Sequence, residues 1–155
     1  MLRAMVVLMV PVVLIVGLYR FLGHEDPPNV DTSSAYGAAQ AAHPYPVLIP
    51  TGLGSKWHVT TAEYAAGTLR VGLTSPDHGA LQLVETNRPD PLPDELGTKA
   101  HVDGTADVNG TAWQRYVGGR PDEQALVLST PGRTVIVVGK SSDQDRLTLA
   151  RSLSG

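Results

Sequence analysis

Three turn sequences constrain most strongly how this chain can fold. SPDHG (residues 75–79), NG (109–110) and PGR (131–133) each separate two segments in which apolar and polar residues alternate. Proline presets φ in a turn, glycine supplies a positive φ, and Asn-Gly is the preferred pair of a type I′ hairpin. Parallel strands would need long crossover connections, usually helices, and none of the intervening segments is long enough. The sequence therefore predicts antiparallel strands joined by hairpins.

Alternation of apolar and polar residues marks the expected strands, and a three-residue apolar spacing marks one helix. Residues 142–153 carry Leu147, Ala150 and Leu153 on one face, after serines at capping distance from Gln144 or Asp145. We therefore expect an α+β fold, in which an antiparallel sheet is covered by a C-terminal helix. The expected strands lie in residues 46–50 at an edge, 56–66, 68–75, 79–87, 105–117, 124–130 and 133–139.

A Gly-Lys-Ser in VIVVGKS, residues 135–141, raises the question of nucleotide binding. A phosphate loop has the pattern G-x-x-x-x-G-K-[ST], whose first glycine lets the backbone curl around phosphate. Here Thr134 takes that glycine's place, and four β-favouring residues follow it. We expect a strand-to-helix corner instead, with the turn at Gly139, an exposed Lys140 and a capping serine.

The N-terminus predicts a membrane anchor. Residues 4–19 carry no charge, and residues 1–22 as a helix would span about 33 Å, enough for a hydrocarbon core of about 30 Å. A cleaved signal peptide and a buried core helix are the alternatives. Because over 100 residues follow the span, the simplest topology is single-pass in the cell membrane, with the C-terminal domain extracytoplasmic.

The next segment differs sharply in composition. Residues 23–44 contain many Pro, Ser, Ala and Gly and few large apolar residues. Such a composition buries too little surface to offset the entropy lost on ordering, so we expect a flexible linker there. Residues 45–155 then form the single folded domain.

Charge and residue types exclude several classes of function. The formal net charge of -3 over 155 residues, without a basic block, argues against a nucleic-acid partner. The absence of cysteine excludes disulfides and zinc-thiolate sites. No pair of histidines has metal-ligand spacing, and no catalytic motif occurs, so we assign no catalytic residue, metal ligand or cofactor.

Four residues are candidates for a binding surface. Trp57, Trp113 and Tyr116 are large aromatic side chains in expected strands, and His78 lies in an expected turn. Trp113 and Tyr116 lie at odd and even positions of one strand, and we expect both to be partly buried against the helix. The alternative is that one anchors the core while the other lines a groove or a partner surface. A less favoured alternative is a small hydrolase in which His78 and Asp77 converge with Asp103, Asp107 or a serine.

Four blocks of sequence resemble a known family. They are YPVLIPTGLGSKWHVTTAEY, LRVGLTSPDHGALQLVETN, VNGTAWQRY and RTVIVVGKSSDQDRLTLARSL. Together with the N-terminal span and polar linker, they resemble the actinobacterial DUF4245 family, a domain of unknown function. The similarity covers nearly all of the chain, and its most specific marks are Pro50, Gly52, Leu53, Trp57, Thr74, Pro76, Gly79, Gly110, Trp113, Gly139, Ala150, Ser152 and Leu153.

The resemblance implies an exported, membrane-tethered domain without an established activity. Nine arginines against three lysines are typical of high-GC genomes, which agrees with an actinobacterial source. We expect a non-enzymatic binding module of the cell envelope, anchored in the lipid bilayer, with an envelope protein as its partner. The alternative is a carrier or sensor that holds an apolar ligand between sheet and helix.

Overall fold

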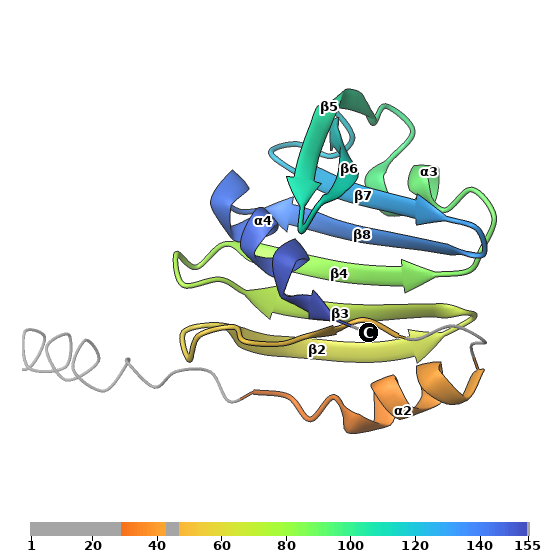
Figure 1. The fold of residues 1–155 in the computed structure, drawn as a ribbon, viewed down its shortest axis with the longest axis vertical. Helices are drawn as coiled ribbons and strands as arrows, with labels where there is room; N and C mark the ends of the chain where they lie inside the picture. Colours follow the sequence, from red (N-terminus) through yellow and green to blue (C-terminus); the bar gives the residue numbers. More distant parts are fainter. Residues whose placement is uncertain (1–28, 43–46, 155) are drawn as a thin grey trace, which may run out of the picture.

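The computed structural model describes residues 29–42 and 47–154, which form a seven-stranded antiparallel sheet with helices packed on it (Figure 1). The strand order is β2-β3-β4-β8-β7-β6-β5, and every pairing is antiparallel, as the turn sequences predicted. The strands are β2 (His58–Ala65), β3 (Thr68–Thr74), β4 (Ala80–Thr86), β5 (His101–Val108), β6 (Thr111–Val117), β7 (Gln124–Thr130) and β8 (Arg133–Lys140).

The C-terminal helix α4 (Asp143–Ser152) crosses one face of the sheet (Figure 1). Its N-cap is Ser142, whose side chain accepts a hydrogen bond from the Asp145 N–H at 3.0 Å, one of the two predicted capping pairs. The chain then ends in β9 (Leu153–Ser154), which pairs with β1 (Ile49–Pro50). The predicted α+β fold with a C-terminal helix is thus confirmed.

Two hairpins show why so many turns contain glycine. Asn109 and Gly110 both have positive φ, 52° and 81°, as a type I′ turn requires. The β2–β3 turn has the same signs at Ala66 (49°) and Gly67 (77°). Alanine is an uncommon residue in this conformation, since its Cβ approaches the backbone.

The sheet has an apolar core on each face. On the face that α4 covers, leucines and valines of the central strands pack with Trp57, Trp113 and Leu149. On the opposite face, Val84, Val127, Ile136 and Val138 pack with Leu96 of the short helix α3 (Leu92–Leu96). An ion pair between Arg70 on β3 and Glu95 on α3 ties this helix to the sheet. Because both faces are covered, β4 is buried without alternation from Leu83 to Thr86, and β8 is buried from Val135 to Val138.

The prediction of a flexible linker over residues 23–44 is wrong for the part that the structure describes. Residues Ser33–Ala42 form helix α2, which packs against β2 and β3. Ala35, Tyr36 and Ala39 are buried at helical spacing, so even this Ala- and Ser-rich segment gains apolar contacts when it docks. The carboxylate of Asp31 accepts a hydrogen bond from the Ser33 N–H, which lowers the pKa of Asp31.

The predicted membrane span, residues 1–22, lies outside the described residues. Within residues 29–42 and 47–154, no helix is both long enough and apolar enough to cross a bilayer.

The Gly-Lys-Ser stretch forms the end of a strand rather than a phosphate loop. β8 continues through Gly139 to Lys140, so the expected corner at Gly139 is wrong by two residues, and the chain turns at Ser141 and Ser142 instead. Gly139 is paired with Leu81 on β4, and a Cβ built there would lie 2.1 Å from the Ala80 carbonyl oxygen. The glycine is therefore needed for the close approach of two strand backbones.

Replacing Gly139 by alanine should lower the free energy of unfolding by about 1–3 kcal/mol, because β4 and β8 must move apart to admit the methyl group. Urea denaturation of the purified chain, followed by tryptophan fluorescence, measures this. Gly37→Ala is the matched control, because Gly37 lies in α2 with open space around its Cα. The control should stabilise slightly, and an unchanged midpoint for Gly139→Ala would refute the close approach.

Replacing Ala66 by asparagine should stabilise the protein by about 0.5–1 kcal/mol, because asparagine tolerates the positive φ of a type I′ turn better than alanine. Thermal unfolding of Ala66→Asn and of Ala65→Asn distinguishes this cause from a general effect of asparagine. Ala65 is also exposed but lies in β2. Equal melting temperatures for the two variants would contradict the explanation.

Candidate functional site

The four residues predicted as a binding surface occupy different places in the fold. Trp57 and Trp113 are buried in the core under α4 and α2. Tyr116 is half-buried on the opposite face, and its hydroxyl donates to Gln114 Oε1 at 3.3 Å. His78 is exposed in the β3–β4 turn with a φ of 59°. Trp113 and Tyr116 lie on opposite faces of the sheet, so the expectation that both are buried against the C-terminal helix is wrong for Tyr116. The four side chains do not share one surface.

The residues considered for a hydrolase are also separated. His78 and Asp77 lie next to β4, whereas Asp103 and Asp107 lie on β5, with β8, β7 and β6 between these strands. Asp107 accepts a hydrogen bond from the Gly110 N–H at 3.3 Å, which stabilises the β5–β6 hairpin. The charge of Asp103 acts on Arg115 of β6. The structure does not bring the four groups into one cleft.

A groove lies between α2, the segment around β1, and strands β2 and β3. It encloses about 230 Å³, and its walls include Tyr36 of α2, Leu53 and Trp57 of the loop before β2, and Val71 of β3. Asn29 and Thr32 add polar groups to the same walls. We call this cavity the α2 groove.

Backbone hydrogen bonds hold the two sides of the α2 groove in place. The Val59 N–H donates to Asn29 Oδ1 at 2.8 Å, and the Val30 N–H donates to the Val59 carbonyl at 3.0 Å. On the other side, the Thr51 N–H donates to the carbonyl of Ser152 at 2.8 Å, next to the β1–β9 pairing. The groove is therefore formed by three segments that are distant in sequence.

Exposed apolar side chains accompany the α2 groove. Ile49, which is 36% exposed, contributes to its wall, and Val30, which is 42% exposed, follows the wall residue Asn29. Within the described part of the chain, the third large apolar residue with comparable exposure is Val102 on β5, at 48%. Two of the three thus lie at or beside the groove.

A buried carboxyl group lies behind Tyr36. Glu85 on β4 is 2% exposed, and both of its oxygens lie 3.1 Å from the Leu48 backbone nitrogen, whose N–H donates to them. Burial raises the pKa of Glu85 to about 7, against the opposing effects of the Leu48 hydrogen bond and the charge of Arg133. Burial and the nearby Glu85 charge likewise raise the pKa of Tyr36.

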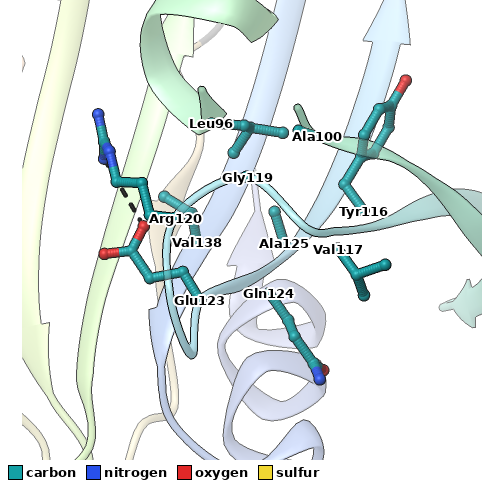
Figure 2. A pocket seen from close by; sticks show the side chains of 10 residues that line it. All are labelled: Leu96, Ala100, Tyr116, Val117, Gly119, Arg120, Glu123, Gln124, Ala125 and Val138. Atoms are coloured by element: carbon teal, nitrogen blue, oxygen red, sulfur yellow. Dashed lines mark ion pairs between the residues drawn. The ribbon is translucent and has the colours of Figure 1, made fainter. Parts of the chain in front are cut away.

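On the opposite side of the sheet, three pockets lie around the β6–β7 loop. One of about 410 Å³ is lined only by residues 117–124, which are this loop and one residue on either side, and one of about 200 Å³ lies against Gln82, Val138 and Lys140. The pocket shown in Figure 2, between Tyr116, Leu96 and the β6–β7 loop, has a volume of about 10 Å³, about that needed for one water molecule. Arg120 and Glu123 at its side form an ion pair at 3.7 Å. The pocket in Figure 2 is thus too small for a ligand, and the two larger hollows beside it share the paired Arg120 and Glu123 in their walls.

Polar side chains also gather where α4 begins. Arg115 on β6 binds the Asp143 carboxylate through two nitrogens and lowers the pKa of Asp143. The buried Arg146 donates to the Ser141 carbonyl at 2.7 Å and to Gln124 Oε1 at 2.6 Å. These bonds fasten α4 to the sheet. Among the described residues, no group of three or more His, Asp or Glu side chains could hold a metal ion.

Sequence reasoning missed Glu85, Tyr36 and the α2 groove. A signal for Glu85 was present, because Leu81, Leu83 and Glu85 have the same parity and must share the buried face of β4. Tyr36 had a weaker signal, because with Ala35 and Ala39 it would lie on one face of a helix. The groove itself had none, because its walls meet only in the folded chain.

Comparisons with known proteins identify the family. No curated protein and no solved structure matches the chain. One family model matches residues 1–153, nearly the whole sequence, and it describes proteins of unknown function. The match agrees with the resemblance seen in the four sequence blocks, and the chain belongs to the DUF4245 family.

Proposed function

We propose that this protein is a membrane-tethered, extracytoplasmic binding module of an actinobacterial cell envelope that receives apolar side chains of a partner protein in the α2 groove. The role is non-enzymatic. The uncharged residues 4–19 support the tether, and the excess of arginine over lysine supports the source. One observation carries the binding role: the exposed Ile49 lines a cavity, and the exposed Val30 follows the wall residue Asn29.

The size of the α2 groove supports a protein partner. Small-molecule sites commonly enclose roughly 300–1,000 Å³, more than the approximately 230 Å³ found here. A groove of this volume suits one or two large side chains, and exposed apolar residues beside it can extend the contact. Burial of apolar surface would supply most of the binding free energy.

A second candidate function is a carrier or sensor of a small apolar ligand. The specific observation in its favour is the position of the groove between a helix and the sheet, with Tyr36 and Trp57 in its walls. Such a ligand would have to be smaller than a typical lipid. Native mass spectrometry of the protein purified from membranes would reveal it as a constant added mass.

Site-specific photo-crosslinking tests the partner. With a benzoyl-phenylalanine at position 49 in the full chain, we expect one defined adduct in intact cells, because Ile49 lies in the groove wall. The matched control carries the same group at position 102, which is similarly exposed but lies on β5. Identical adducts at both positions, or none at position 49, would reject the groove as the binding site.

Membrane fractionation tests the tether. The full chain should sediment with membranes, resist extraction by carbonate at high pH, and dissolve in detergent, because residues 1–22 would anchor it by apolar burial. A chain that lacks residues 1–22 should be found in the soluble fraction. Protease added outside spheroplasts should degrade the domain, and a protected domain would overturn the proposed orientation.

A further inference from the structure

Glu85 joins three parts of the structure that the chain order keeps apart. Its backbone belongs to β4, its carboxylate binds the Leu48 N–H in the segment before β1, and its charge acts on Tyr36 of α2. The residue pairs with Leu69 on one side and with Val135 on the other. The carboxyl group is therefore enclosed by apolar residues of three strands, with Leu48 hydrogen-bonded to it and the buried Tyr36 of α2 near enough to feel its charge.

Two titratable groups of the described residues interact with the charge of Glu85. They are Tyr36 from α2 and Arg133 from β8, and the segment before β1 adds the Leu48 N–H. Arg133 favours the ionised carboxylate, but the loss of hydration outweighs it. An ionised Glu85 is thus much less stable in the closed structure than in water.

Helix α2 and the segment before β1 can be released without breaking the large sheet. Helix α2 has ten residues and lies beyond the β2 edge, and β1 makes only a two-residue pairing with β9. Short peripheral elements of this kind open locally at lower free energy than central strands. Opening would admit water to the carboxylate and widen the α2 groove, which Tyr36 lines.

We propose that Glu85 is a pH-sensitive latch, which holds α2 and the Leu48 segment closed over the sheet when its carboxyl group is neutral and releases them when it ionises. The latch follows from the packing around Glu85. Its effect on partner binding rests on the proposed function of the α2 groove.

The direction in which pH shifts the closed form follows from proton linkage. The pKa of Glu85 is about 7 when the latch is closed and is expected to return to its ordinary value of 4.5 when water reaches the group. The closed form is therefore favoured most below pH 4.5, and this preference is lost as pH rises through 7. The cap at Asp31 does not oppose this change, because its lowered pKa keeps it ionised throughout this range.

Hydrogen exchange of the full chain in detergent micelles measures the latch directly. In the peptides that cover residues 29–42, the opening constant, corrected for intrinsic exchange, should rise about tenfold between pH 6 and pH 8. The rise should disappear in Glu85→Gln, whose amide cannot ionise but still accepts the Leu48 hydrogen bond. Glu63→Gln, an exposed glutamate on β2, is the control and should behave as wild type.

Two results would overturn the latch: an opening constant of wild type that does not depend on pH, or the same dependence in Glu85→Gln. If Glu85→Gln does not fold, a carbon-13 NMR titration of the wild-type carboxyl decides instead. A midpoint near 7, shared by the α2 amide signals, supports the latch, and a midpoint near 4.5 rejects it.

Hydrogen exchange and crosslinking together distinguish a failure of the latch from a failure of the proposed binding function. Exchange is measured without a partner, whereas crosslinking at position 49 reports binding. A pH-dependent exchange with no adduct at any pH would support the latch and reject the proposed function. Equal adducts at pH 6 and pH 8, with pH-dependent exchange, would reject control of binding by the latch.

Discussion

The pairing of β4 with β8 is the interaction on which the rest of this structure depends. It joins seven consecutive residue pairs, from Ala80 with Lys140 to Thr86 with Thr134, and it is the only pairing that links β2–β4 to β5–β8 within the described sheet. Because side chains alternate, the same two strands supply both apolar cores. Their joining across some fifty residues costs chain entropy, which burial on both faces must offset.

This arrangement explains the position of the candidate site. α4 follows β8 directly and leads to β9, which in turn fixes β1 beside the α2 groove. Glu85 stands near the end of β4, and its charge acts on Tyr36 of α2. The site is therefore placed at one edge by elements that are themselves held by the centre of the sheet.

Local features of the fold could be predicted from sequence because they depend on a few neighbouring residues. Asn109-Gly110 specified its turn, and Ser142 specified the start of α4. Helix α2 was missed because a short Ala- and Ser-rich segment forms a helix only through contacts with distant strands. The strand order and the groove were unpredictable for the same reason. The burial of Glu85 could have been predicted from its alternation with Leu81 and Leu83. An acidic residue near the end of an apolar strand is, however, usually expected to be solvent-exposed.

The attachment of Asn29 and Val30 to Val59 also decides how the domain would respond to mechanical force. A pull on the chain preceding Asn29 would first load the two hydrogen bonds to Val59 and then peel α2 from the edge of the sheet. The β4–β8 pair lies two strands further in and would bear load only afterwards. Tension and ionisation of Glu85 would thus act on the same element in the same direction, while the central strands keep their register.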